Sequence, residues 1–162
     1  MDQQGAYSRH GAWPVSVARI LLDTNVLSEL MRPQPEPRVL GWFSAQAAQT
    51  RFVISAITQA EILLGIALLP AGKKRSALAT AAQTLFEQEF RGLNLAFDEH
   101  AAPAYAAIVS ARSRSGAPIS VEDAQIAAIA SHHRVPLATR NTKDFAHVPG
   151  LVLINPWEHA LT

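Results

Sequence analysis

Polar side chains with ligand or acid–base chemistry stand where short apolar runs of this chain end. Asp23 directly follows Ile-Leu-Leu, and Asn141 comes just after Pro-Leu-Ala-Thr. Glu61 and Asp123 lie at the beginning of longer amphipathic stretches. Carboxylates that share one crevice repel each other unless a cation neutralises them. Oxygen ligands without cysteine suit Mg²⁺, or alternatively Mn²⁺, and a water beside such an ion can attack a phosphodiester.

Each carboxylate also has a simpler structural interpretation. Asp23 is a favoured residue type for capping the helix that follows it. Thr58 and Glu61 have the spacing of a capping box, and so do Ser120 and Asp123. The residue types alone therefore do not separate a helix cap from a metal ligand. Only their joint position in the fold favours the chemical interpretation.

The elements that must position these residues alternate between short apolar runs and longer amphipathic stretches. The predicted strands are Arg19–Asp23, Arg51–Ser55, Leu93–Phe97, Pro136–Thr139 and Val152–Ile154. The predicted helices are Asn25–Met31, Arg38–Ala48, Ile57–Leu69, Lys74–Phe90, a helix capped by Asp98 and running to about Ser115, and Val121–His133. This alternation indicates an α/β fold with a parallel sheet and helices on both faces. In such sheets the ligand crevice lies at the carboxyl ends of the strands.

Length and composition limit the alternatives. The 162 residues suit a single domain at 19–162, preceded by a polar N-terminal extension at 1–18 that we expect to be poorly ordered. The absence of cysteine excludes a disulfide framework, a thiolate zinc site and a cysteine nucleophile. A net charge of +1 means that any contact with nucleic acid depends on a local basic patch. No apolar run suggests a membrane span or signal peptide, so a cytoplasmic protein is expected.

Four ordered stretches resemble one known family. They are I-L-L-D-T-N-V-L-S-E-L, S-A-I-T-Q-A-E-I-L-L-G-I, S-V-E-D-A-Q-I-A-A-I-A and L-A-T-R-N-T-K-D-F. They resemble PIN-domain proteins, and look closest to the VapC toxins of bacterial toxin–antitoxin pairs, especially the FitB-like branch. The closing I-N-P-W also resembles that branch. The resemblance covers about residues 19 to 158.

The resemblance implies a PIN-like three-layer α/β/α sandwich with a central parallel sheet. It implies a Mg²⁺-dependent ribonuclease that acts on RNA, forms a homodimer and is silenced by a cognate antitoxin whose chain enters a groove. It also leaves other roles open. The chain could cleave DNA, process RNA without toxicity, or serve as a non-catalytic or weakly catalytic module that binds a DNA-binding antitoxin. An aspartyl phosphatase is disfavoured, because the position two residues after Asp23 is Asn25 rather than a second acid.

Carried over by position, the resemblance assigns roles to individual residues. Asp23, Glu61 and Asp123 look like the acidic metal-site residues, with Asp23 and Asp123 holding the ion and Glu61 completing the site as a base. Asn141 stands where many PIN domains have a fourth acid, and Asp144 could supply the missing charge or serve in a loop. The remaining polar positions of the site are Thr24, Asn25, Thr139 and Arg140. Among them, Thr139 would orient water or phosphate together with Asn141, and Arg140 is the main candidate for a phosphate contact.

Overall fold

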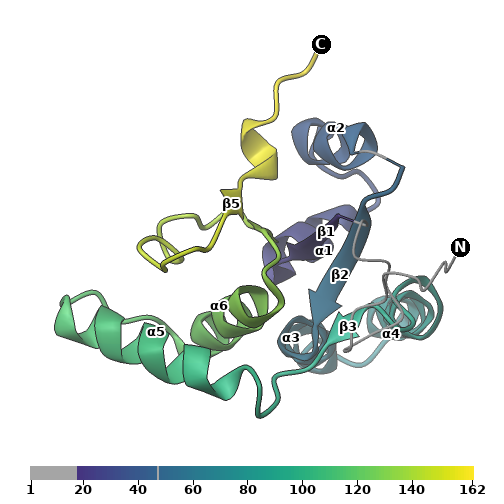
Figure 1. Ribbon diagram of the computed structural model, residues 1–162. Helices are drawn as coiled ribbons and strands as arrows, with labels where there is room; N and C mark the ends of the chain where they lie inside the picture. The colour runs from purple at the N-terminus through teal and green to yellow at the C-terminus, as the bar shows by residue number, and fades with distance from the viewer. Residues whose placement is uncertain (1–17, 47) are drawn as a thin grey trace, which may run out of the picture.

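Five parallel strands form the centre of the protein. The computed structural model describes residues 18–46 and 48–162, and Figure 1 shows the sheet between its helices. The strands pair in the order β3-β2-β1-β4-β5, all in parallel. They are β1 (Arg19–Leu22), β2 (Arg51–Ser55), β3 (Asn94–Leu95), β4 (Leu137–Ala138) and β5 (Leu153–Ile154). The predicted parallel sheet is confirmed, although three of its strands are two residues long.

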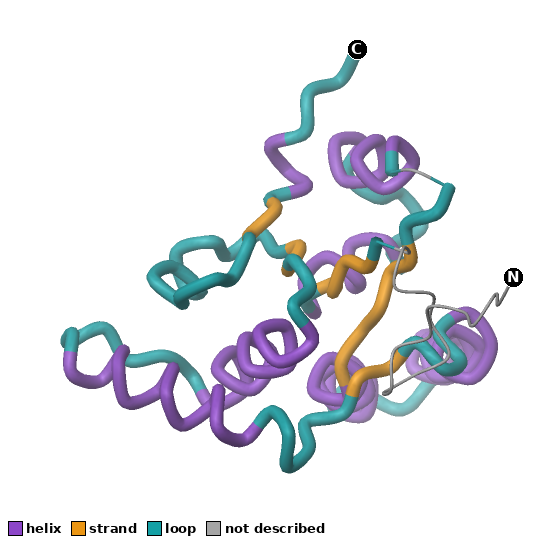
Figure 2. The backbone as a smooth tube through the Cα atoms, viewed as in Figure 1, coloured by secondary structure: helices purple, strands orange, loops and turns teal. Residues whose placement is uncertain are grey.

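Helices connect the strands and cover the sheet, as the tube in Figure 2 shows. They are α1 (Thr24–Leu30), α2 (Pro37–Ala45), α3 (Ala56–Ala67), α4 (Lys73–Thr84), α5 (Ala102–Arg114) and α6 (Val121–His133). A π-helical turn, η1 (Leu85–Glu89), continues α4, and a 3₁₀ turn, η2 (Pro156–Glu158), follows β5. None of the helices in the described part of the chain is long and apolar enough to cross a membrane.

Alternating side chains of β1 point into two separate cores. Leu21 belongs to a cluster with Ile126 and Ile129 of α6 and Ile108 of α5. Its neighbours Ile20 and Leu22 belong to the opposite cluster, which contains residues of α1 and Trp42 of α2. Successive residues of a strand point to opposite faces, so a run that is apolar throughout must be buried on both sides. This two-sided burial confirms the predicted three-layer α/β/α arrangement.

The helix expected over Arg38–Ala48 ends early, at Ala45, and two other predicted helix boundaries are wrong. The helix expected from Asp98 begins at Ala102, because the Asp98 carboxylate accepts hydrogen bonds from the backbone N–H groups of His100 and Ala101 and so closes a turn instead. Pro103 then stands in the first turn of α5, where its missing N–H costs nothing. The helix expected over Lys74–Phe90 changes to π geometry at Leu85. None of these changes alters the order of the elements.

The predicted N-terminal extension lies outside the described residues, except for Ala18. The backbone N–H of Arg51 donates to the Ala18 carbonyl at 2.8 Å. Ala18 therefore already lies alongside β2, one residue earlier than the predicted start of the domain. The register pairs Leu22 of β1 with Ala138 of β4, so these two strands end level with each other. Asp23 and Thr139, the next residues of the two strands, are thereby brought side by side.

Candidate active site

Asp23 is at the centre of the site at the carboxyl edge of the sheet. Its side chain is only 4% exposed, and both carboxylate oxygens accept hydrogen bonds. Oδ1 accepts from the backbone N–H of Thr24 at 2.9 Å, which caps α1. Oδ2 accepts from the Thr139 hydroxyl at 2.7 Å and from the Asn25 side-chain amide at 3.3 Å. The cap interpretation of Asp23 is therefore correct, and it coexists with contacts to Thr139 and Asn25 at the carboxyl edge of the sheet.

The ionised form of Asp23 is costly in this position. Burial raises the pKa of Asp23 to about 6, although the hydrogen bonds from Thr139 and Thr24 lower it. The negative charges of Asp123 and Glu61 raise this pKa further. Asp123 and Glu61 are thus near enough to Asp23 for their charges to act on its carboxylate. A cation beside them would reverse this effect.

Glu61 is held in a way that the sequence did not predict. The N-cap of α3 is Ser55, whose hydroxyl accepts from the backbone N–H of Thr58 at 3.1 Å. The predicted capping box of Thr58 and Glu61 is therefore wrong, because both residues already lie inside the helix. The Glu61 carboxylate instead accepts from the Thr24 hydroxyl at 2.8 Å, and this contact joins α3 to α1. Glu61 is exposed, with its carboxylate at the rim of the crevice.

Asp123 lies in the first turn of α6. Ser120 caps that helix, as predicted, because its hydroxyl accepts from the Asp123 backbone N–H at 3.2 Å. Burial raises the pKa of Asp123, and the charges of Asp144 and Glu122 add to this effect. A hydrogen bond with Ser120 and the charge of Arg112 lower the same pKa. Asp144 therefore lies close enough to Asp123 to contribute negative charge to the site.

The loop after β4 completes the crevice. The Asn141 backbone N–H donates to the Thr139 hydroxyl at 3.0 Å, and the Asp144 N–H donates to the Asn141 carbonyl at 3.0 Å. This turn agrees with the simpler interpretation of both residues, and both side chains are exposed. Thr139 is fully buried, with its proton donated to Asp23. Its hydroxyl thus supports the acid rather than reaching toward solvent.

Arg140 connects this loop to two other segments. Its backbone N–H donates to the Asn25 side-chain oxygen at 3.2 Å. Its guanidinium carbon lies 5.1 Å from the centre of the Trp157 ring, which is a cation–π distance. Arg140 is exposed beside the carboxylates, so it remains a candidate for phosphate contact.

Arg112 is a residue near the site to which the sequence assigns no place. Its guanidinium donates to the backbone carbonyls of Ala117 at 2.6 Å, Asp144 at 2.8 Å and Ala146 at 3.2 Å. One side chain of α5 thus joins the segment before α6 to the loop after β4. The sequence shows only an arginine in the last turn of a helix, where cations are common for a different reason, the helix dipole. No local pattern indicates carbonyl partners about 30 residues away.

The donor set fits a hard cation that keeps most of its waters. In residues 18–46 and 48–162, no three His, Cys, Asp or Glu side chains converge closely enough to hold a metal ion. Mg²⁺ is commonly bound in proteins through one or two carboxylates, with waters filling its other positions. Asp23, on which the charge of Asp123 acts, and Asp123 supply two such carboxylates, and Glu61 lies within electrostatic reach of Asp23. The chemistry of the site therefore suits Mg²⁺ with few direct protein ligands.

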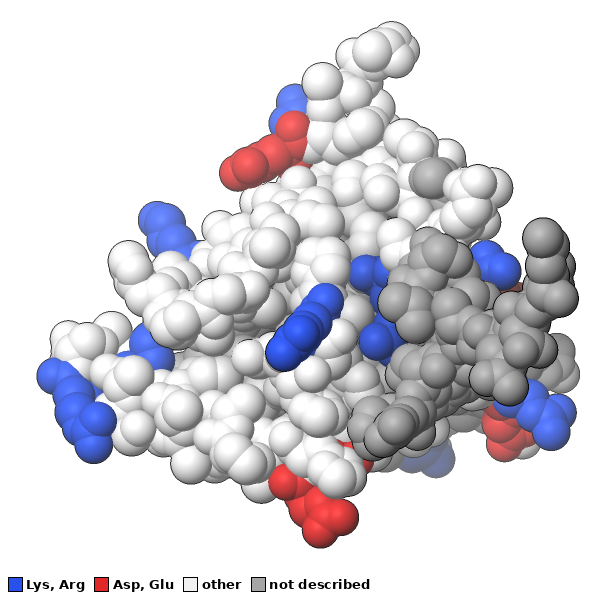
Figure 3. Space-filling model, in the orientation of Figure 1, with Lys and Arg blue, Asp and Glu red and all other residues white. Residues whose placement is uncertain are grey.

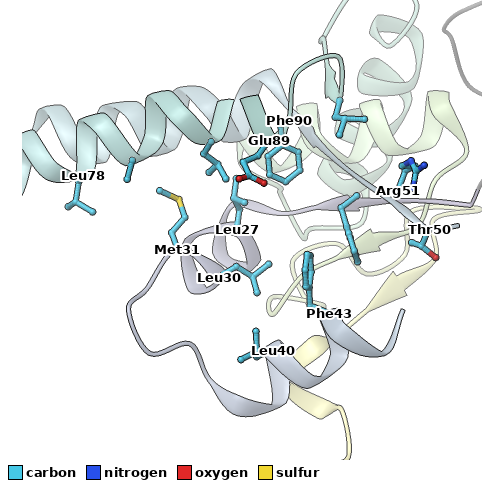
Figure 4. A pocket seen from close by; sticks show the side chains of 14 residues that line it. Leu27, Leu30, Met31, Leu40, Phe43, Thr50, Arg51, Leu78, Glu89 and Phe90 are labelled. Atoms are coloured by element: carbon cyan, nitrogen blue, oxygen red, sulfur yellow. The ribbon is translucent and has the colours of Figure 1, made fainter. Parts of the chain in front are cut away.

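Two adjoining grooves lie on the side of the molecule that carries α1, and the second of them reaches the candidate site. The first, about 560 Å³ in volume, lies between α1, α2, α4 and η1, and Figure 4 shows its mainly apolar lining, with Leu30, Leu40 and Phe43 on its walls. The second, about 470 Å³, shares Met31 and Leu78 with the first and extends to Thr24 and Glu61. On the face of the molecule shown in Figure 3, Lys and Arg side chains are dispersed rather than gathered in one patch.

The sequence and structure are similar to those of known proteins. The family model described as PIN domain matches residues 20–151. VapC ribonuclease Y4jK of Sinorhizobium fredii is 41% identical over 141 residues, which are 87% of this chain and 99% of that protein. Toxin FitB of Neisseria gonorrhoeae is 42% identical over 138 residues, which are 85% of this chain and 98% of that protein. The structure of FitAB bound to an IR36 DNA fragment matches with a TM-score of 0.78 and 41% identity, over 88% of this chain and 98% of that one.

Proposed function

Since this chain belongs to the PIN-domain family, we propose that it is a Mg²⁺-dependent ribonuclease and the toxin of a toxin–antitoxin pair. The observation that carries this proposal is the raised pKa of the buried Asp23 at the carboxyl edge of the sheet, to which burial contributes most and the charges of Asp123 and Glu61 add. A buried carboxylate with further carboxylates beside it is typical of sites that bind a cation. Relatives named as a VapC ribonuclease and a toxin support the same assignment.

In the proposed site, Asp23 and Asp123 would hold the ion, and Glu61 would complete the site as the base for the attacking water. Bound Mg²⁺ would supply positive charge that screens the phosphate and favours an ionised water. The residues of this chain do the positioning. Thr24, Asn25 and Thr139 fix the Asp23 carboxylate by three hydrogen bonds, and the Thr24 hydroxyl fixes Glu61.

The reaction that this arrangement supports is hydrolysis of a phosphodiester. A water oxygen forms a bond to phosphorus as one P–O ester bond breaks. Glu61 accepts a proton from the attacking water, and the departing oxygen takes a proton from solvent. Asn141 is exposed beside the acids and would orient the water or a phosphate oxygen, whereas Arg140 would contact a neighbouring phosphate.

Pairing with an antitoxin is the second half of the proposal. Similar structures include FitAB bound to an IR36 DNA fragment and VapBC-1 from nontypeable Haemophilus influenzae. The apolar groove of Figure 4 shares Met31 and Leu78 with the second groove, which reaches Thr24 and Glu61, so an antitoxin segment with apolar side chains could extend across both and cover Glu61. A homodimer is also part of this proposal. The alternative, a module that binds an antitoxin without cleaving RNA, rests on Asn141 at the position of a fourth acid.

Cleavage of structured RNAs by the purified protein tests this function. We expect the wild type to cut with Mg²⁺ and to lose its activity in EDTA. The variant Asp123→Asn should lose at least about 100-fold in rate, since it removes a charge that holds the ion. Glu99→Gln, an exposed acid outside the site, is the matched control and should cut like wild type. Cutting by Asp123→Asn at the wild-type rate would refute the proposed site, and wild-type cutting in EDTA would refute the metal dependence.

A further inference from the structure

A chain of three hydroxyl groups runs from the interior of the protein to Glu61. Ser55 and Thr58 are fully buried, and the Ser55 hydroxyl donates to the Thr58 hydroxyl at 3.3 Å. The Thr58 and Thr24 hydroxyls are 3.0 Å apart. The Thr24 hydroxyl then donates to Glu61 Oε1 at 2.8 Å. Thr24 lies in α1 and Thr58 in α3, so this chain of hydroxyls joins two helices that are 34 positions apart in the sequence.

The number of protons determines the direction of every bond in this chain. A hydroxyl has one proton to donate, whereas a carboxylate can only accept. Thr24 donates its proton to Glu61, so its oxygen must accept the proton of Thr58. The Thr58 oxygen in turn accepts from Ser55, whose oxygen accepts from the Thr58 backbone N–H at 3.1 Å. All protons therefore point toward the carboxylate, and hydrogen bonds arranged head to tail strengthen one another.

Glu61 depends on this chain for its orientation. Its side chain is exposed, and within the described residues the Thr24 hydroxyl is its hydrogen-bond donor. A free glutamate side chain samples several rotamers, and ordering it costs conformational entropy. A single hydroxyl that is itself held by a buried partner reduces this freedom before the ion or the substrate arrives.

Capping of α3 does not explain the Thr58 hydroxyl. The cap is the bond from the Thr58 backbone N–H to Ser55, and valine at position 58 would retain that N–H. The Thr58 side chain points instead toward Thr24 of α1. Its hydroxyl is therefore available for a role in the site.

We infer that Thr58 is a positioning residue, which acts through Thr24 to orient the Glu61 carboxylate for the proposed metal-dependent hydrolysis. The inference rests on the proposed function but concerns a residue that does not touch the substrate or the ion. Removal of the Thr58 hydroxyl leaves the Thr24 hydroxyl without its donor, so that Thr24 is free to rotate away from Glu61.

The variants Thr58→Val and Thr58→Ser test this inference. Valine keeps the shape of threonine and removes the hydroxyl, whereas serine keeps the hydroxyl. Binding of Mn²⁺ alone, followed by water proton relaxation, measures the site without RNA, and kcat and KM are measured on a cleaved RNA. Loss of a side chain that orients a ligand typically costs about 10- to 100-fold in metal affinity or activity. We expect Thr58→Val to lose about 10-fold in kcat and several-fold in Mn²⁺ affinity, with KM nearly unchanged, and Thr58→Ser to restore both.

Two controls distinguish positioning from general damage. Thr80→Val makes the same chemical change on the exposed surface of α4 and should leave kcat and Mn²⁺ affinity unchanged. If Thr58 acts through Thr24, the double variant Thr24→Val/Thr58→Val should be no worse than Thr24→Val alone. Thr58→Ala replaces Thr58→Val if the valine variant does not fold.

Three results would overturn the inference. They are wild-type kcat and Mn²⁺ affinity in Thr58→Val, equal losses in Thr58→Ser and Thr58→Val, and additive losses in the double variant. Failure of the proposed function gives a different pattern, in which the wild type neither cuts RNA nor binds Mn²⁺. That pattern would refute both the proposed function and the inference. If the wild type binds Mn²⁺ and cuts RNA, and Thr58→Val does both equally well, only the inference is refuted.

Discussion

Asp23 caps a helix and lies at the centre of the acidic site with the same carboxylate. Its Oδ1 satisfies the first N–H of α1, while Oδ2 accepts from Thr139 and Asn25. A local pattern suffices to predict the cap, because an aspartate before a helix is a favoured N-cap. The partners of Oδ2 include a residue 116 positions away, which only the pairing of β1 with β4 brings near.

The raised pKa of Asp23 predicts a stability that depends on pH in the metal-free protein. The pKa is 3.8 without burial and about 6 in the folded protein, so the folded state binds an extra proton between these values. The stability contributed by this proton is complete below about pH 4 and is lost as the pH rises through 6. A shift of about two units corresponds to roughly 3 kcal/mol as an upper limit.

Urea unfolding in EDTA at pH 4.5 and pH 7.5 checks this prediction, with wild type beside Asp23→Asn. The free energy of unfolding of the wild type should fall relative to that of Asp23→Asn as the pH rises, because asparagine cannot ionise. Added Mg²⁺ should recover part of the loss at pH 7.5. A difference between the two proteins that is the same at both pH values would contradict the prediction.

At the scale of elements, α5 and the loop after β4 are joined by a single guanidinium. Arg112 donates to three backbone carbonyls, two of which belong to the loop that carries Asn141 and Asp144. Hydrogen bonds from charged groups contribute more than neutral ones, about 1.5 to 3 kcal/mol. Arg112 is partly exposed, and solvent screening weakens its hydrogen bonds. We therefore expect its three contacts together to contribute about 1 to 2 kcal/mol to the free energy of unfolding.

We therefore expect Arg112→Ala to lower the free energy of unfolding by about 1 to 2 kcal/mol, measured by urea denaturation. Arg112→Lys should recover only part of this loss, since one ammonium group cannot reproduce the geometry of the guanidinium. The matched control is Arg114→Ala, two residues further along the same helix and exposed. Equal losses in Arg112→Ala and Arg114→Ala would show that the carbonyl contacts contribute nothing.

At the scale of the whole molecule, α3 presents leucines to solvent. Leu64 is 58% exposed and Leu68 is 76% exposed, and their spacing of four residues puts them on one face of the helix. Contiguous exposed apolar surface of this kind is typical of a protein–protein interface. A second copy of the chain that covered this face would account for it.

Light scattering coupled to size-exclusion chromatography should therefore give twice the 17.5 kDa mass of one chain. The double variant Leu64→Asp/Leu68→Asp should elute as a monomer, because it would place two charges in the interface. Val152→Asp alters a residue that is 61% exposed elsewhere on the surface and should remain dimeric. A monomeric wild type, or a dimeric double variant, would contradict this interface.

The sequence alone determines much of the architecture of this protein. Alternation of apolar runs and amphipathic stretches predicts the order of the elements and the parallel sheet, because these periodicities are local properties of the chain. Local rules also predict the caps at Asp23 and Ser120, which use residues within a few positions. They fail at Thr58 and Glu61, where Ser55 is a better cap three residues earlier and the capping pattern matches by coincidence.

Only the tertiary structure decided which distant side chains meet. The strand order β3-β2-β1-β4-β5 follows from how the helices pack, and no periodicity encodes it. The contacts of Thr139 with Asp23, Thr24 with Glu61 and Arg112 with the loop carbonyls span from 32 to 116 residues. The residue types are visible in the sequence, but a hydroxyl or a guanidinium can serve many acceptors. Burial and packing select one of them, and this selection positions the carboxylates of the proposed site.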